Sequence, residues 1–117
     1  MNKAPPTKMP AVFYRTRGGA ELVLDWVRSL DEGDRNAIGL DLMRVQYRWP
    51  VGMPLCRSLG NGLWEVRVGL PSKRIARLIF SVREGKILVL HGFIKKTQKT
   101  PAEDLELARR RDKEFEK

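Results

Sequence analysis

The chain has 117 residues, 42% of them hydrophobic, and this size fits one compact domain with a modest core, which excludes a multidomain architecture. Its 23 Lys and Arg against 14 Asp and Glu leave a formal net charge of +9, which favours a polyanionic partner, with nucleic acid ahead of a membrane surface. The single cysteine, Cys56, excludes an internal disulfide framework and a zinc site built from several thiolates. A reducing cytoplasm is the compartment that fits this cysteine usage best.

The first ten residues contain three prolines and two lysines but no apolar run, so we predict no signal peptide. No stretch of the chain approaches the roughly 20 apolar residues that a membrane-spanning helix needs. We therefore expect residues 1–10 to form a loosely held Pro-rich arm and residues 11–117 to form a single domain without membrane association.

The positive charge is concentrated in the middle of the chain. Residues 1–52 carry a net charge of +2, residues 53–99 carry +8, and residues 100–117 carry −1. The middle segment also holds the most strand-like sequence, so we predict a basic surface on a β-sheet. The alternative is a solvated face that lysines keep soluble.

The first half of the chain predicts a strand followed by two helices. Residues 11–15 (AVFYR) are β-branched and aromatic, as an opening strand would be, and Gly18 and Gly19 end it. Apolar residues at helical spacing predict one helix over 20–30 and a second that follows the cap residues 31–34 and ends before Pro50. Because the connection is so short, the two helices should form an antiparallel hairpin.

The second half predicts three strands and a last helix. Residues 63–69 (LWEVRVG) and 74–83 (RIARLIFSVR) alternate between apolar and polar positions, and residues 86–95 (KILVLHGFIK) are apolar on both faces. Residues 100–103 (TPAE) have the signature of a capping box for a thin amphipathic helix. The predicted fold is α+β: an N-terminal strand, an antiparallel helical hairpin, a three-stranded antiparallel sheet and a C-terminal helix, with one sheet face partly open.

A two-residue turn at Glu84-Gly85 predicts the register of the last two strands. If Arg83 faces Lys86, then Phe80 meets Val89, Leu78 meets His91, and Arg77 meets Gly92. Arg77 would then stand on the open face beside a glycine that leaves room for a ligand, whereas His91 would lie on the helix-covered side. Replacing so exposed an arginine should cost at most about 1 kcal/mol of stability.

The alternation within strands also places Arg67 on the open face, and Lys96 joins it if the last strand continues that far. We therefore predict Arg67, Arg77 and Lys96 as a phosphate-binding catalytic cluster, because guanidinium groups bind phosphate in a bidentate way and stabilise charge that builds during cleavage. Further basic residues near the rim are predicted to bind RNA: Lys73, Arg74, Lys95 and Lys99.

Several residues have a structural interpretation that we prefer. Cys56 has no neighbouring activating group and should be inert packing. The three tryptophans lie on apolar faces and should anchor the core rather than stack on bases. Arg67 could instead pair with the acidic last helix, and Arg109 to Arg111 should belong to a solvated face.

Three segments, LWEVRV, RIARLIF and LVLHGFIKKTQKTP, followed by AEDLELARRR, resemble the phage-derived HigB-like branch of the RelE/ParE toxin superfamily of type II toxin–antitoxin modules. The resemblance covers Val12 to the C-terminal helix, and HGFIKKTQKTP is its most specific part. It implies a RelE-like fold and a growth-inhibiting mRNA interferase that enters the ribosomal A site and cleaves messenger RNA. The implied chemistry is metal-independent attack of the ribose 2′-hydroxyl on the adjacent phosphate, with no cofactor.

The resemblance also implies site residues and partners. Arg77 matches the sheet arginine that stabilises the phosphate, Arg67 and Lys96 match basic strand positions, and a helix-turn-helix antitoxin is the implied partner beside the ribosome and mRNA. Several RelE-like members use a C-terminal tyrosine as the base, but here Tyr14 and Tyr47 both precede the sheet, so the general base is unassigned. Two alternatives stay open: a ParE-like inhibitor of DNA gyrase, which would lack the basic set, and a non-enzymatic RNA-binding accessory protein.

Overall fold

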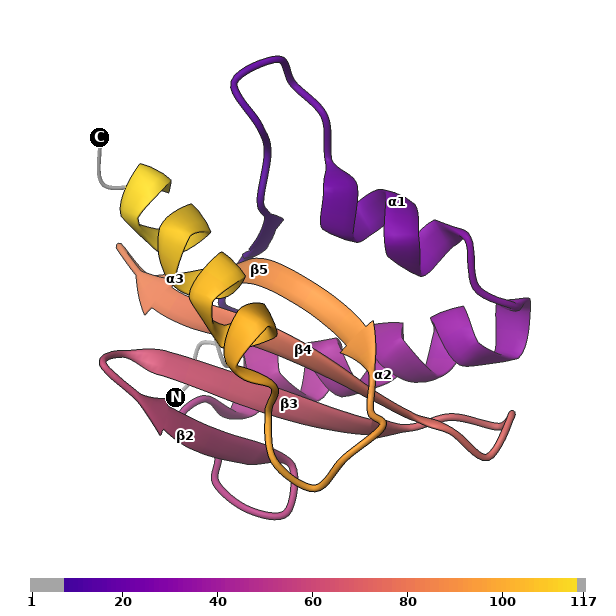
Figure 1. The fold of residues 1–117 in the computed structure, drawn as a ribbon. Helices are drawn as coiled ribbons and strands as arrows, with labels where there is room; N and C mark the ends of the chain where they lie inside the picture. Colours follow the sequence, from indigo (N-terminus) through magenta and orange to yellow (C-terminus); the bar gives the residue numbers. More distant parts are fainter. Residues whose placement is uncertain (1–7, 116–117) are drawn as a thin grey trace, which may run out of the picture.

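The computed structural model describes residues 8–115, which form three helices and five strands (Figure 1). In chain order these elements are β1 (Ala11–Phe13), α1 (Leu22–Arg28), α2 (Glu32–Arg48), β2 (Cys56–Gly60), β3 (Leu63–Gly69), β4 (Ile75–Arg83), β5 (Lys86–Ile94) and α3 (Ala102–Phe115). Most of the predicted N-terminal arm lies outside the described residues. At its described end, Met9 is tied to α2, since its backbone N–H donates to the Gln46 carbonyl at 3.0 Å. No helix within residues 8–115 has the length and hydropathy to cross a bilayer.

The predicted strand and helical hairpin of the first half are confirmed, with slightly shorter bounds. Figure 1 shows α2 running back beneath α1 behind the sheet. The inner faces of these helices pack into the core through four buried residues, Val23, Ile38, Leu42 and Val45. Trp49 packs edge-on against Trp64 at a centroid distance of 4.9 Å, so these two tryptophans anchor the core as expected.

The sheet is mixed and has five strands in the order β1-β5-β4-β3-β2, with β1 parallel to β5 and the other pairs antiparallel. The predicted three-stranded antiparallel sheet was therefore wrong in its number of strands: the predicted N-terminal strand, β1, joins the sheet beside β5, and a further strand was not predicted. The prediction missed β2, whose sequence CRSLG shows little apolar alternation because the strand lies at the sheet edge and buries only Cys56. Burial raises the pKa of the Cys56 thiol to about 11, which agrees with an inert packing role.

Both faces of the sheet carry helices, which corrects the expected open face. Helices α1 and α2 cover one face, and α3 lies over β4 and β5 on the other (Figure 1). On the α3 face a second apolar cluster includes Ile79, Leu88, Leu90 and Ala108. Three polar residues that share this face, Glu65, Arg77 and Ser81, are buried.

A β-bulge in β5 changes the predicted register halfway along the β4–β5 hairpin. Near the turn the prediction is confirmed, since Arg83 pairs with Lys86 and Phe80 with Val89. The extra residue at Leu90 then shifts the pairing, so Ile79 meets His91 and Leu78 meets Gly92. Gly92 therefore faces α1, where an added Cβ would come within 2.6 Å of the Trp26 ring, and leaves no room for a ligand.

The same bulge turns His91 to the α3 face, opposite to its predicted side, where its Nε2 lies 2.6 Å from Oδ1 of Asp104. Asp112 accepts hydrogen bonds from Ser81 at 2.7 Å and from Arg83 at 2.8 Å. Arg111 donates to the Leu90 carbonyl at 2.8 Å, so the 109–111 run is not simply a solvated face as predicted. These contacts fasten α3 to β4 and β5 along its length.

Candidate functional site

A cavity of about 470 Å³ opens at the end of the sheet where β4 begins and β5 ends. It lies between the β3–β4 turn and the linker that joins β5 to α3. Four of its eight lining residues are cations and none is acidic; the lining residues are Lys73, Arg74, Ile75, Ile94, Lys95, Lys96, Thr97 and Gln98. We call this cavity the basic pocket. Its size falls within the range of ligand sites, and its charge suits a polyanion.

The structure brings together four of the seven predicted site residues in the basic pocket: Lys73, Arg74, Lys95 and Lys96. Lys99 is exposed on the same linker but does not line the pocket. Arg67 is half-buried on β3, next to the pocket, and pairs in register with Arg77 on β4. The remaining residue, Arg77, occupies a different environment.

Arg77 is almost fully buried, with 1% of its surface exposed, so the expectation that it stands on an uncovered face is wrong. Its Nη2 donates to the Gln98 carbonyl at 2.7 Å, and its Nε lies 3.5 Å from Oε1 of Glu65, in an ion pair without hydrogen-bond geometry. Thr100 donates its hydroxyl to the other oxygen of Glu65 at 2.7 Å. This network ties the linker to the sheet.

Thr100 was predicted to cap the last helix, but its hydroxyl serves Glu65 instead. The helix begins at Ala102, and its first turn is closed by the bond from the Leu105 N–H to the Pro101 carbonyl. The capping prediction failed because a buried carboxylate competes for the same hydroxyl, and an unsatisfied carboxylate inside the protein costs more than an uncapped amide near solvent.

The other wall of the basic pocket depends on Asp34, for which the sequence predicts only a place at the start of a helix. Asp34, in the first turn of α2, is buried, and it accepts hydrogen bonds from the Ser72 hydroxyl at 2.9 Å and from Arg74 at 3.3 Å. Burial by itself would raise the pKa of Asp34, but the bonds from Ser72 and Arg74 outweigh it and the pKa is lowered. Asp34 thus holds the turn that presents Lys73 and Arg74.

Lys95 lies in the basic pocket directly after the end of β5. Its removal from water, together with the nearby charges of Arg67 and Arg77, lowers the pKa of its ammonium group, and Glu65 partly opposes this effect. Its Nζ lies 3.3 Å from the Gln98 side-chain oxygen, and its backbone N–H donates to the Ile75 carbonyl at 2.7 Å. A lysine held in this way can release its proton more readily than a free lysine.

Neither tyrosine lies in the basic pocket. Tyr14 donates its hydroxyl to Glu114, which together with burial raises the pKa of the phenol. Tyr47 lies on α2 and is 51% exposed. No three His, Cys, Asp or Glu side chains among residues 8–115 are grouped so that they could hold a metal ion.

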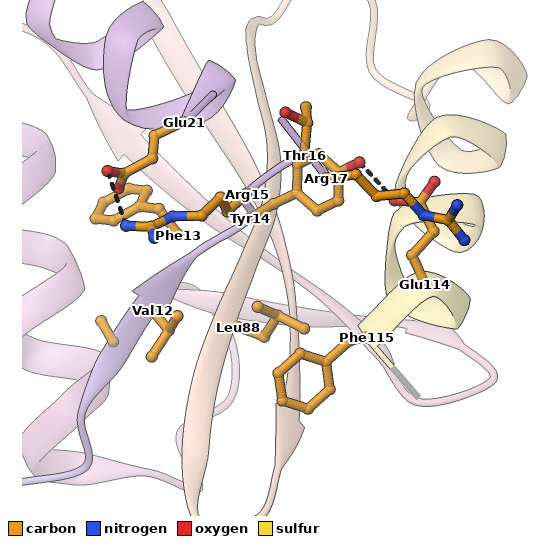
Figure 2. A pocket seen from close by; sticks show the side chains of 11 residues that line it. Val12, Phe13, Tyr14, Arg15, Thr16, Arg17, Glu21, Leu88, Glu114 and Phe115 are labelled. Carbon is orange, nitrogen blue, oxygen red and sulfur yellow. Dashed lines mark hydrogen bonds and ion pairs between the residues drawn. The ribbon is translucent and has the colours of Figure 1, made fainter. Parts of the chain in front are cut away.

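A second cavity, of about 780 Å³, lies beside β1 between the loop that leads to α1 and the end of α3 (Figure 2). Figure 2 shows Val12, Leu88 and Phe115 along its apolar side and the Tyr14–Glu114 bond across it. Its two arginines, Arg15 and Arg17, are balanced by two glutamates, and Arg15 is paired with Glu21 at 3.3 Å. This cavity contains none of the predicted site residues and has no excess positive charge.

Comparison with protein families gives a match over most of the chain. The profile of the phage-derived Gp49-like proteins (DUF891) matches residues 25–113, from α1 to nearly the end of α3. A search of curated proteins found no significant match. The matched region includes every residue of the basic pocket. The chain therefore belongs to the Gp49-like family, a family of toxin–antitoxin toxins within the RelE/HigB-like superfamily.

Proposed function

We propose that this protein is the toxin of a type II toxin–antitoxin module and acts as a ribosome-dependent mRNA endonuclease of the HigB kind. The single observation that carries the proposal is the basic pocket, where four cations from two separate segments surround one cavity without a carboxylate. Membership of a toxin family supports the biological role. A ParE-like gyrase inhibitor would have no use for such a set of phosphate-binding groups.

In the proposed reaction the RNA phosphate lies in the basic pocket among Lys73, Arg74 and Lys96. These charges neutralise the phosphate and stabilise the negative charge that builds on it when a fifth oxygen bonds to phosphorus. Arg67, beside the pocket, contributes to the same field. No metal ion or cofactor takes part in this proposal.

Lys95 is our candidate for the general base, because its lowered pKa increases the fraction of neutral amine. The neutral amine takes the proton from the ribose 2′-hydroxyl, and the resulting oxygen attacks the adjacent phosphorus. The bond to the 5′-oxygen then breaks, and that oxygen takes a proton from a neighbouring ammonium group such as Lys96. The products are a 2′,3′-cyclic phosphate and a 5′-hydroxyl end.

Arg77 has a positioning role in this proposal. Its bond to the Gln98 carbonyl fixes the linker that carries Lys95, Lys96 and Lys99. We propose the bacterial cytoplasm as the place of action, the ribosome and mRNA as targets, and a helix-turn-helix antitoxin as the inhibitor. Neutralisation by such an antitoxin accounts for how a cell tolerates the gene.

The test is induced expression of the wild-type chain, with RNA ends mapped before and after induction. Cuts in translated messages that follow the codon phase, absent with Lys95→Met but present with Lys86→Met, are the expected result. Lys86 is an exposed control at the opposite end of β5. Intact messages together with broken DNA would instead support inhibition of gyrase. Normal growth after induction would support the remaining candidate, a non-enzymatic RNA-binding protein.

A further inference from the structure

The outer face of α2 is apolar where a surface helix is normally polar. Leu40, Met43 and Tyr47 are 49%, 45% and 51% exposed. They follow one another at i, i+3 and i+7, so they form one stripe along the helix, which we call the outer stripe. The buried residues Ile38 and Val45 point to the opposite side. The helix is therefore apolar on two faces, and within residues 8–115 only the inner one packs against the rest of the fold.

A glycine lies beside the outer stripe, and no contact within residues 8–115 requires a glycine there. Gly39 lies in the interior of α2, is exposed, and has no positive φ. A Cβ added to it would meet nothing within 4 Å. Alanine is the better helix former at such a position, so the fold alone gives no reason for glycine. Its missing side chain does, however, allow another backbone to approach closely next to Met43.

The charges around the outer stripe indicate what could cover it. Arg44 and Arg48 border it on the side away from Gly39, and both are exposed. Arg44 is paired with Asp41 at 2.6 Å, whereas the side chain of Arg48 makes no ion pair or hydrogen bond within residues 8–115. A formal net charge of +9 opposes association with a second copy of the chain. An acidic partner suits this border.

From this geometry we propose that the outer stripe of α2 is a docking site for an amphipathic, acidic α-helix of another protein. The apolar side of that helix covers Leu40, Met43 and Tyr47, a small residue of it packs against Gly39, and its carboxylates face Arg44 and Arg48. This surface is separate from the basic pocket, and the inference does not depend on the proposed nuclease activity.

The probe is a fluorescein-labelled 14-residue helical peptide with leucines at i, i+3 and i+7, alanine on one flank and two glutamates one turn apart on the other. A matched peptide has lysines in place of the glutamates. Anisotropy titrations with the full-length chain should show at least about tenfold tighter binding of the glutamate peptide. Met43→Glu should weaken its binding about tenfold or more, whereas Met53→Glu should have little effect. Met53 is an equally large apolar residue, 64% exposed, in the loop after α2.

Gly39→Ala gives the sharpest readout, because its two expected effects have opposite signs. The substitution should raise the melting temperature by about 3 °C, because alanine has the better helix propensity. It should also lower the affinity for the glutamate peptide about fivefold, because the added methyl group fills the space beside the outer stripe. Unchanged affinity in Gly39→Ala, equal losses in the two methionine variants, or no saturable binding would overturn the proposal. A homodimer that is detected by analytical sedimentation and that dissociates in Met43→Glu would also overturn the proposal, because a second copy of the chain would then cover the outer stripe.

Discussion

The guanidinium of Arg77 on β4 lies diagonally across from the carboxylate of Glu65 on β3, and both side chains are shut off from solvent. Their closest nitrogen and oxygen are 3.5 Å apart, too poorly aligned for a hydrogen bond, and the pair is completed by Thr100 and the Gln98 carbonyl. A strand arginine with the sequence signature of a phosphate ligand thus serves as an internal tie between the sheet and the basic linker.

Replacement of Arg77 by alanine should destabilise the fold strongly, because it leaves Glu65 buried without a counter-charge. We expect a loss of about 3–5 kcal/mol in the free energy of unfolding, measured by urea denaturation. The sequence alone, which predicts an exposed Arg77, leads to the opposite expectation of almost no loss of stability. Arg67→Ala, on the half-buried neighbour, should cost only on the order of 1 kcal/mol.

A double variant separates loss of charge balance from loss of volume in the same experiment. Glu65→Leu combined with Arg77→Met should recover much of the stability that Arg77→Ala loses, because apolar side chains of similar size can replace a buried ion pair. Stability as high in Arg77→Ala as in the wild type would contradict the buried network.

The affinity for single-stranded RNA should depend steeply on salt, through the lysines of the basic pocket. Removing Lys73 or Lys96 should reduce the slope of log affinity against log salt by about 0.7 for each phosphate that the protein no longer neutralises. Fluorescence anisotropy with a labelled oligonucleotide across a salt series measures this slope. Lys86→Ala, outside the pocket, should leave it nearly unchanged, and an equal reduction in all three variants would indicate diffuse charge instead of a site.

The cleavage rate should rise with pH and level off above the pKa of Lys95, because only the neutral amine can accept a proton. The lowered pKa places this midpoint below the ordinary lysine value of 10.5. Single-turnover cleavage of a programmed ribosome complex between pH 6 and pH 10 measures the profile. Lys95→Arg keeps the positive charge, but its guanidinium stays protonated over this pH range. This variant should therefore still bind RNA, but its cleavage rate should no longer increase with pH. An unchanged profile in that variant would exclude Lys95 as the base.

Attachment of α3 should weaken in acid through Asp112. Burial opposes the charge of Asp112, but hydrogen bonds from Arg83 and Ser81 outweigh it and lower its pKa from the usual 3.8. Because the pKa of Asp112 is lower in the folded state than in the unfolded state, its charged form stabilises the fold. This stabilisation is complete at pH values above the unfolded-state pKa, and it is lost as the pH falls through the folded-state pKa. Melting temperatures recorded from pH 6 to pH 2 should therefore fall less steeply in Asp112→Asn than in the wild type. Asp25→Asn, at an exposed position on α1, should follow the wild-type curve.

Apolar periodicity determined the local elements of this chain. The helical spacing in α1 and α2 and the alternation in β3 and β4 follow from which neighbouring side chains need burial, and the turn at Glu84-Gly85 follows from the positive φ angles that a two-residue hairpin loop requires. The same pattern predicted Arg74 and Lys95 near the rim of the site, and the structure places Lys73 and Lys96 beside them. These predictions needed only short-range information.

The tertiary structure alone decided the face that each polar side chain occupies in β5 and the environment of Arg77. Because β5 is apolar on both sides, its pattern could not reveal the extra residue at Leu90, and that one residue exchanged the faces of His91 and Gly92. Arg77 is buried only because Glu65 and Thr100, 12 and 23 positions away in sequence, offset its desolvation. A local sequence pattern shows where a charged residue stands in the chain. Whether its side chain is buried or exposed depends on residues distant in sequence that contact it in the folded protein.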